Sequence, residues 1–184
     1  MNIYKSEHIY LKKACMDDTT AMYQNVWSDR DISKYMNFKP IDNLADAKIM
    51  MQQSIEYQKH SMSFLVYDKS TDEAIGFAGV KKVSDSDYAE SGLCIAKKCQ
   101  GKGYGKELLL LLLSIVFDEL HGDKFIYAAM EGNTVSINLC RSCGFVYDSS
   151  ETVIRKWDNY EYVSEIYTLT AKQYYKQVKK LKCS

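Results

Sequence analysis

One glycine-rich stretch carries residue types and a spacing that suit phosphate binding. Residues 99–106 read Cys-Gln-Gly-Lys-Gly-Tyr-Gly-Lys and lie between a strand-like segment and a long helical segment. Backbone N–H groups in a turn that opens a helix, together with the positive end of the helix dipole, attract phosphate oxygens. Glycines before a helix can also form a simple tight turn, so this stretch alone predicts either a phosphate site or a turn.

Two nucleotide-binding patterns do not fit this stretch. In the dinucleotide fingerprint G-x-G-x-x-G the third glycine comes one residue later than Gly105 does. A Walker A loop has four residues between its glycines and a Ser or Thr after its Lys. Here three residues separate Gly101 from Gly105, and no Ser or Thr follows Lys106. The pattern that remains is Gln-x-x-Gly-x-Gly, formed by Gln100, Gly103 and Gly105.

The cysteines offer a second possible chemistry, which the spacing does not favour. Six cysteines are spread irregularly, at positions 15, 94, 99, 140, 143 and 183. The chain is too large to need disulfide stapling, so free thiols are the better interpretation. Cys140 and Cys143 form a CxxC pair, but Cys94 and Cys99 have four residues between them and no His lies close by. A zinc site is therefore the weaker alternative, and we expect no metal.

Composition excludes several classes of protein. The chain has 184 residues, with 24 basic and 24 acidic side chains and a formal net charge of zero. A nucleic-acid binder needs a surplus of Lys and Arg facing phosphate, so no nucleic-acid partner is expected. Hydrophobic residues make up 46% and charged residues 26%, which is typical of a globular chain and excludes disorder as the main state.

Apolar segments are too short for a membrane protein. The longest apolar run, residues 108–117, is interrupted by Ser114, whereas a membrane span needs about 20 apolar residues. The N-terminus has no apolar segment typical of an export signal. We expect a cytoplasmic protein with no membrane partner, either a monomer or a homodimer.

The periodicity of apolar residues predicts one continuous domain over residues 1–184, because no repeat and no Gly/Ser/Pro-rich linker divides it. In the first part we expect a strand at 9–14, a helix capped by Asp17 or Asp18, an aromatic loop at 35–40 and a helix at 44–58. Strands at 64–67, 74–83 and 88–95 predict an antiparallel meander. The elements expected after it are a helix at 104–120, a strand at 125–130, a helix at 134–142 closed by Gly144, strands at 152–157 and 163–169, and a basic tail helix at 172–182.

Four features in order resemble one enzyme family. The Gln100, Gly103 and Gly105 pattern is similar to the pyrophosphate-binding loop of the GNAT N-acetyltransferases, which use acetyl-CoA. Residues 89–95 occupy the place of that family's central acetyl-CoA strand. Asn133-x-x-Ser136, followed by Cys-Gly-Phe at 143–145, resembles the family's helix that ends in Gly-Phe. Residues 27–29 and 35–40 are similar to the branch of ribosomal-protein N-terminal and spermidine acetyltransferases, and the whole resemblance spans about residues 8–170, followed by the basic tail helix (171–184).

The resemblance implies the GNAT fold, a mixed α/β (α+β) architecture with a largely antiparallel sheet and helices on both faces. It implies acetyl transfer from acetyl-CoA to a primary amine by direct attack in a ternary complex. The phosphates of the co-substrate are expected at the loop backbone and its pantetheine arm beside the central strand. The implied residues are Leu93, Cys94, Ile95, Gln100, Gly101, Lys102, Gly103, Tyr104, Gly105, Lys106 and Asn133.

The catalytic residues are less determined. Glu90 stands where some members carry a glutamate general base, and the alternative is a structural strand glutamate; Asp87 and Tyr88 are lesser candidates. Many members place the acid Tyr at the position of Cys140, whose thiol could donate a proton or pack in the core. In the ribosomal-protein branch the acid role maps onto Ser136. That branch also has a glutamate where Arg155 stands here, which weakens any transfer of its peptide substrate.

The acceptor is expected near Trp27, Tyr35, Phe38 and residues 157–162. A peptide or protein α-amine is favoured, and polyamine, amino-acid and aminoglycoside acceptors remain open. A protein that binds CoA without turnover, as a sensor or interaction module, is the alternative from another class.

Overall fold

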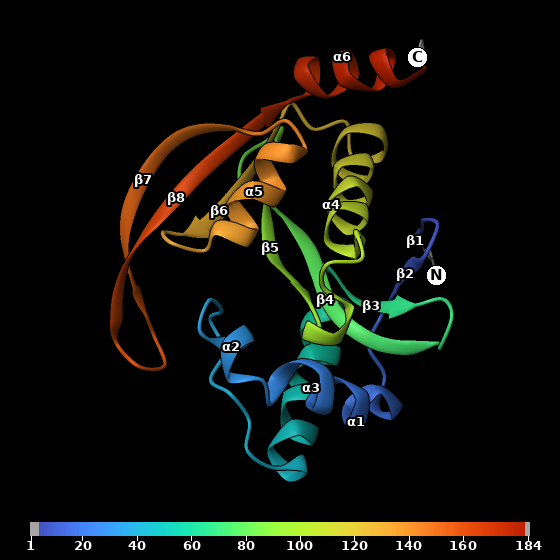
Figure 1. The fold of residues 1–184 in the computed structure, drawn as a ribbon, viewed down its shortest axis with the longest axis vertical. Helices are drawn as coiled ribbons and strands as arrows, with labels where there is room; N and C mark the ends of the chain where they lie inside the picture. Colours follow the sequence, from blue (N-terminus) through green and yellow to red (C-terminus); the bar gives the residue numbers. More distant parts are fainter. Residues whose placement is uncertain (1–3, 183–184) are drawn as a thin grey trace.

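An eight-stranded sheet runs through the computed structural model, which describes residues 4–182 (Figure 1). Its strands are β1 (Tyr4–Lys5), β2 (Ile9–Lys12), β3 (Met62–Asp68), β4 (Glu73–Lys82), β5 (Asp87–Ile95), β6 (Lys124–Met130), β7 (Val146–Arg155) and β8 (Tyr160–Thr170). The order across the sheet is β1-β2-β3-β4-β5-β6-β8-β7, and all neighbours are antiparallel except β5 and β6. The predicted meander of three strands is β3 to β5 and is confirmed.

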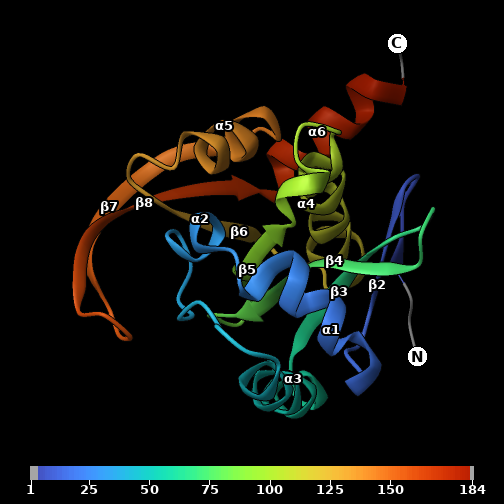
Figure 2. The ribbon, with the colours of Figure 1, turned by 60° about the horizontal axis from the view of Figure 1, so that its bottom comes forward.

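Helices cover both faces of the sheet (Figure 2). On one side lie η1 (Met16–Asp18), α1 (Thr19–Met22), η2 (Tyr23–Trp27), α2 (Arg30–Ser33) and α3 (Leu44–Lys59). On the other side lie α4 (Tyr104–Ser114), its π-helical continuation η4 (Ile115–Glu119) and α5 (Thr134–Ser142). The short turn η3 (Lys97–Cys99) precedes α4, and α6 (Ala171–Lys182) packs beyond the end of α4. The predicted mixed fold with a largely antiparallel sheet is confirmed.

Each face of the sheet has its own hydrophobic core. On the α4 and α5 side, Leu108, Leu109, Leu112 and Leu113 of α4 are buried, as expected for an apolar stripe at helical spacing. On the α1 and α3 side, a second cluster contains Trp27 and side chains from α3 and the sheet. The two cores hold the sheet rigidly between two helical layers.

Asp18 takes part in capping the first helical segment, as the sequence predicts, but it does so from the third residue, because the segment already turns at Met16 in η1. The Asp18 carboxylate accepts a hydrogen bond from the Cys15 N–H at 2.9 Å, which completes a capping box at the start of η1. The same carboxylate accepts a hydrogen bond from the Tyr67 hydroxyl at 2.6 Å. This second, tertiary contact ties the helix entrance to β3.

The sheet splits in its middle. β5 and β6 pair in parallel only over Asp87–Ala89 and Lys124–Ile126. Beyond this point β5 continues to bond β4 on its other side, while β6 bonds β8 along its whole length. The remaining part of β5 therefore keeps a backbone edge that no described strand pairs. Such an edge is available to an added extended group.

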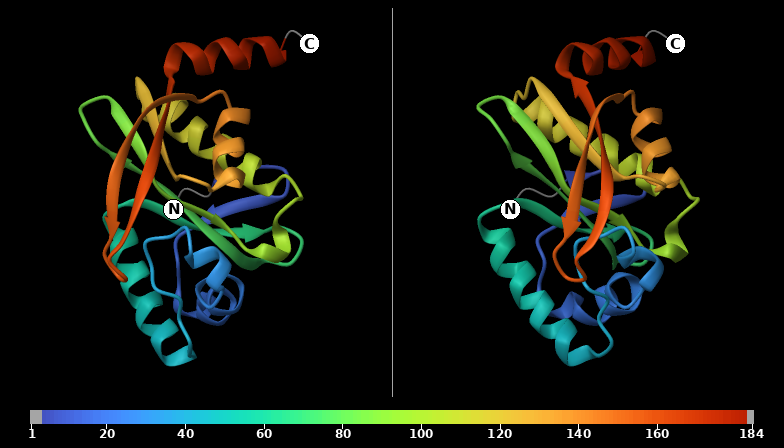
Figure 3. Two further views of the ribbon diagram at one scale, coloured as in Figure 1. Left: turned by 60° about the vertical axis from the view of Figure 1, so that its left-hand side comes forward. Right: turned by 90° about the vertical axis from the view of Figure 1, so that its left-hand side faces the viewer.

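The β7–β8 hairpin is longer than the predicted strands at 152–157 and 163–169. β7 and β8 pair from Val146 to Arg155, with a register shift between Tyr147 and Ser149. Most residues of β7 are exposed on both faces, so the alternation that marks a strand in a sequence is absent there. Figure 3 shows the hairpin curving away from the sheet and reaching toward the segment after α2.

The described cysteines are all free thiols. Cys15, Cys94, Cys99, Cys140 and Cys143 form no disulfide, and no group of three or more His, Cys, Asp or Glu in residues 4–182 is placed to hold a metal ion. Cys183 lies outside the described residues.

Thiol titration of the denatured, unreduced protein is expected to count close to all six cysteines, because their spacing fits neither a disulfide framework nor a zinc site. Stoichiometric zinc in elemental analysis would contradict this prediction.

Within residues 4–182, no helix is long and apolar enough to cross a membrane.

Candidate active site

A cleft with a volume of about 1430 Å³ opens where β5 and β6 separate. Residues of β5 and β6 line it, together with the glycine-rich loop and α5 on one side and the α1–α3 layer on the other. It is larger than the usual range for a single small-molecule pocket, about 300–1,000 Å³. The cleft therefore has room for two substrates that meet at the split in the sheet.

The glycine-rich loop forms an open cradle at the start of α4. Gly101 has φ +75° and Gly103 has φ +85°, in the left-handed region that favours glycine. A Cβ atom at either position would meet no atom within 4 Å. Because the loop backbone is uncovered and leads directly into α4, its N–H groups fit a phosphate-bearing group.

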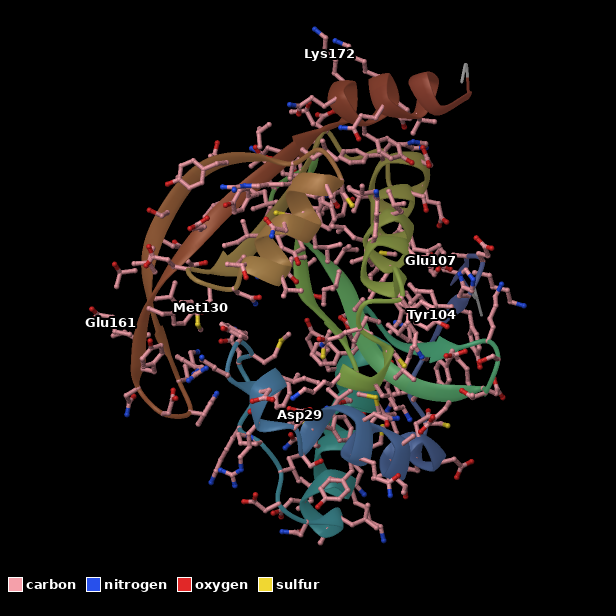
Figure 4. The ribbon with its side chains drawn as sticks, viewed as in Figure 1. Asp29, Tyr104, Glu107, Met130, Glu161 and Lys172 are labelled. Atoms are coloured by element: carbon pink, nitrogen blue, oxygen red, sulfur yellow. The ribbon has the colours of Figure 1, made fainter. Side chains whose placement is uncertain are left out.

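The predicted loop residues do not all face the cleft. Gln100, Gly101, Gly103, Gly105 and Lys106 line it, whereas Lys102 and Tyr104 do not. The Tyr104 ring stacks on His8 with ring centroids 5.7 Å apart, and its hydroxyl donates to Asp68 Oδ2 at 3.3 Å. Figure 4 shows Tyr104 and Glu107 together on the β1–β2 side of α4.

The unpaired edge of β5 lies next to this cradle. Leu93, Cys94 and Ile95 all line the cleft, as the sequence predicted for the central strand. The Cys94 side chain is buried in the core on the α1 and α3 side of the sheet, and this burial raises the pKa of its thiol to about 12. Cys94 therefore contributes its backbone to the cleft and not a reactive thiolate.

Glu90 sits at an irregular point of β5. The pairing with β4 shifts between Ala78 and Val80, and the Glu90 carboxylate accepts a hydrogen bond from the Gly92 N–H at 2.6 Å. Burial of the carboxylate, opposed by the Gly92 bond and by Lys81, raises the pKa of Glu90 to about 7. A carboxylate with this pKa in a cleft can accept a proton near neutral pH.

Tyr127 is a site residue that sequence reasoning missed. Its hydroxyl lies 2.9 Å from the Ser136 Oγ, and both residues line the cleft. The Ser136 N–H donates to Asn133 Oδ1 at 3.2 Å, so Asn133 caps α5. Burial and the nearby Glu90 raise the pKa of Tyr127 above its usual range, which keeps its hydroxyl protonated.

The Cys140 thiol lies apart from this group. Cys140 is fully buried, does not line the cleft, and its Sγ donates to the Ile137 carbonyl at 3.2 Å. Burial raises the pKa of its thiol to about 12. The structure brings Glu90 and Ser136 to one cleft but leaves Cys140 in the core, and we do not assign a proton-donor role to it. Asp87 also faces elsewhere, with Oδ2 3.0 Å from Lys124 Nζ.

Aromatic side chains line a further part of the cleft. Trp27, Tyr35 and Phe38, the three predicted acceptor residues, all line it. Phe38 packs edge-on against Phe77, with ring centroids 6.2 Å apart. We call this part the aromatic half of the cleft; it is formed by Trp27, Tyr35, Phe38, Tyr57, Phe77 and Tyr162.

The charges around the cleft are balanced. The carboxylates that line it are Asp31, Glu90 and Glu151, and the lysines that line it are Lys81, Lys97 and Lys106. Asp31 is already engaged, because its Oδ2 forms an ion pair with Lys97 Nζ. The described part of the cleft therefore has no surplus of negative charge.

Comparisons with known proteins agree with this geometry. A family model described as "Acetyltransferase (GNAT) domain" matches residues 8–146. The "Uncharacterized N-acetyltransferase p20" of Bacillus licheniformis is 31% identical over 150 residues, which is 79% of this chain and 83% of that protein.

Solved structures show the same fold at low identity. An acetyltransferase (GNAT family) from Bacillus anthracis has a TM-score of 0.79 at 18% identity, covering 93% of this chain and 99% of that one. A spermidine N-acetyltransferase from Vibrio cholerae, solved with CoA and spermine, has a TM-score of 0.74 at 17% identity, covering 92% of this chain and 99% of that one.

Proposed function

Since this chain belongs to the GNAT family of acetyltransferases and is an acetyl-CoA-dependent acyltransferase, we propose that its acceptor is the α-amine of a peptide or protein. A small amine with an apolar body is the second candidate. The aromatic half of the cleft is the observation that carries this proposal.

The balance of charge in the cleft disfavours a polycationic acceptor. Polyamines and aminoglycosides carry several positive charges, and recognition of such ligands relies on complementary negative potential. Of the carboxylates that line the cleft, Asp31 is paired with Lys97 and the charge of Lys81 acts on Glu90, which leaves Glu151. A peptide N-terminus brings one ammonium group and apolar neighbours, which suits an aromatic wall with few free carboxylates.

The described residues fit acetyl-CoA at the other half of the cleft. The uncovered backbone of Gly101 and Gly103 at the start of α4 is the place for the pyrophosphate. The unpaired edge at Leu93, Cys94 and Ile95 is the place for the extended pantetheine arm. Lys106 faces the cleft and adds positive charge there. When bound, acetyl-CoA supplies the acetyl thioester that the amine attacks.

The side chains of the cleft can perform the two proton transfers. Glu90 accepts the proton that the amine loses as its nitrogen bonds to the acetyl carbon. A backbone N–H near Cys94 stabilises the negative charge on the acetyl oxygen. As the carbon–sulfur bond breaks, the Ser136 hydroxyl donates a hydrogen bond or a proton to the sulfur, and the Tyr127 hydroxyl 2.9 Å away holds Ser136 in place.

The acceptor is tested by measuring thiol release from acetyl-CoA with a panel of amines. The panel contains short peptides with different N-terminal residues, their Nα-blocked forms, spermidine, an aminoglycoside and free amino acids. We expect turnover with unblocked peptides, strongest when the first residues are apolar, and none with the blocked forms. A kcat/KM for spermidine or the aminoglycoside above that of every peptide would contradict the proposed acceptor.

A further inference from the structure

Arg155 is a buried charge that the chemistry above does not use. Only 6% of its surface is exposed. Its Nε donates to Asp158 Oδ1 at 2.9 Å and its Nη2 donates to Asp158 Oδ2 at 2.5 Å, so the pair is bidentate. Two parallel N–H···O bonds between a guanidinium and a carboxylate are stronger than neutral hydrogen bonds, and they fix the relative orientation of the two groups.

The same guanidinium reaches across to the segment after α2. Its Nη1 donates to the Lys34 carbonyl, 121 residues away in the chain. The neighbouring Trp157 Nε1 donates to the Met36 carbonyl at 3.4 Å, and the Arg155 guanidinium lies over the Trp157 ring, 4.4 Å from its centroid. We call Arg155, Trp157 and Asp158 the hairpin anchor.

The hairpin anchor occupies the tip of the β7–β8 hairpin. β7 ends at Arg155 and β8 begins at Tyr160, and the turn between them is held by the Tyr160 N–H bond to Asp158 Oδ1 at 3.2 Å. β7 is the last strand of the sheet and pairs only with β8. Figure 3 shows this hairpin extending from the sheet to the segment after α2.

The two segments that the anchor joins are opposite walls of the cleft. Residues 35–38 line the cleft from the α2 side. Glu151, Val153 and Tyr162 line it from the hairpin side, close to the tip. The distance between these walls sets which acceptor fits, because small misplacements of binding groups cost large factors in rate.

We propose that Arg155 is a specificity-determining positioning residue that pins the hairpin to residues 34–38 and so fixes the width of the acceptor site. Three of its five N–H donors bond Asp158 and the Lys34 carbonyl, and Arg155 does not line the cleft, so it acts through the walls and not on the acceptor. This inference rests on the proposed function, because it assigns the aromatic half of the cleft to the acceptor.

The test compares Arg155→Lys and Asp158→Asn with wild type. Lys cannot form the bidentate pair and reach Lys34 at the same time, and Asn removes the charge partner. We expect the KM for the best peptide of the panel to rise about tenfold or more in both variants, while the KM for acetyl-CoA stays within about twofold. Because both substitutions break the same pair, the double variant is expected to be no worse than the poorer single one.

The matched control is Arg141→Lys. Arg141 also combines a hydrogen bond, to the Tyr167 hydroxyl at 3.0 Å, with a guanidinium 5.3 Å from that ring, but it does not line the cleft. We expect both KM values of this variant to stay close to wild type. A peptide KM within about twofold of wild type in folded Arg155→Lys and Asp158→Asn proteins would overturn the proposal, since a bidentate buried pair is worth more than that.

Amide hydrogen exchange gives a readout that needs no acceptor. With acetyl-CoA present, the two variants are expected to exchange faster than wild type at residues 34–38 and 152–163, and to match it in β3 and β4. Unchanged exchange in both segments would overturn the pinning role. If the wild type acetylates no peptide in the panel, the proposed acceptor fails, and the exchange data still decide whether Arg155 pins the hairpin.

Discussion

Glu90→Gln is expected to lower turnover at pH 7 by about 10² to 10⁴-fold, the usual contribution of a general base. Gln has nearly the shape of Glu, and its Oε1 can still accept the hydrogen bond from the Gly92 N–H. The contact between residues 90 and 92 is therefore retained, and only the proton acceptor is removed. Steady-state rates and acetyl-CoA affinity, measured on the same preparation, separate a loss of catalysis from a loss of binding. The rate should fall, and the affinity should barely change.

The pH dependence of kcat/KM tests the role of Glu90 as the base more directly than the rate at one pH. Burial raises the pKa of Glu90 to about 7, so the ionised form that accepts protons is present above this pH and is lost as the pH falls through it. Wild-type kcat/KM is expected to rise across pH 7, and this step should be missing in Glu90→Gln. At higher pH, where more of the amine is already free, the deficit of the variant should shrink.

As the pH rises through about 7, the activity of the wild type should increase, whereas the contribution of Glu90 to its unfolding free energy should decrease. The pKa of Glu90 is raised on folding, so the native state is favoured most while the group is protonated, and this contribution is lost as the pH rises through about 7. Gln is neutral at every pH and avoids that loss. The difference in unfolding free energy between Glu90→Gln and wild type is therefore expected to shift in favour of the variant between pH 5 and about pH 8. A loss of packing would not produce this pH dependence.

Asp87→Asn provides the control for Glu90. Asp87 lies on the same strand, but its carboxylate pairs with Lys124 and does not line the cleft. We expect this variant to keep most of its activity and the step near pH 7. A Glu90→Gln rate within about twofold of wild type, with chemistry shown to limit turnover, would leave the proton to a water relay and remove Glu90 as the base.

Local sequence signals predicted the parts of the site that depend on local conformation. The glycines at 101, 103 and 105 mark a strand-to-helix turn whatever surrounds them, and Asn133 is a helix cap for the same reason. Glu90, Ser136, Trp27, Tyr35 and Phe38 are predicted by the resemblance to the family, and the structure brings all of them to one cleft.

Features that depend on distant partners could not be predicted in this way. The Tyr127–Ser136 contact joins a strand to a helix, and a single tyrosine in a strand has no spacing signal. The bonds of Arg155 cross 121 residues. Cys140 lies on the side of α5 that faces the core, so its burial follows from how α5 packs against β6 and α4. Each of these is decided by tertiary packing, which overrides local preference.

Gly103→Glu is expected to weaken acetyl-CoA binding by about 100-fold. The loop offers N–H groups to a charged phosphate, and hydrogen bonds of this kind are worth about 1.5–3 kcal/mol each. A Cβ at Gly103 meets no atom within 4 Å, so the fold has room for the side chain, which would extend over the uncovered backbone. A calorimetric titration of acetyl-CoA into the folded variant measures the loss directly.

Gly103→Ala separates the charge from the backbone strain. Both substitutions place a Cβ at φ +85°, which costs about 1 kcal/mol relative to glycine. Ala adds nothing beyond that strain, so its affinity loss should be about tenfold or less, close to the value of the strain alone.

The salt dependence distinguishes repulsion from a misfolded loop. The Glu side chain is exposed to solvent, so its repulsion of the phosphates is screened as salt rises and the Debye length falls from about 10 Å at 0.1 M to about 3 Å at 1 M. The difference in acetyl-CoA affinity between Gly103→Glu and Gly103→Ala should therefore become smaller at high salt, whereas a distorted loop would keep this difference constant. Equal affinities of Gly103→Glu and wild type at low salt would mean that the phosphates bind away from residues 100–106, and the cradle at the start of α4 would then be only a turn.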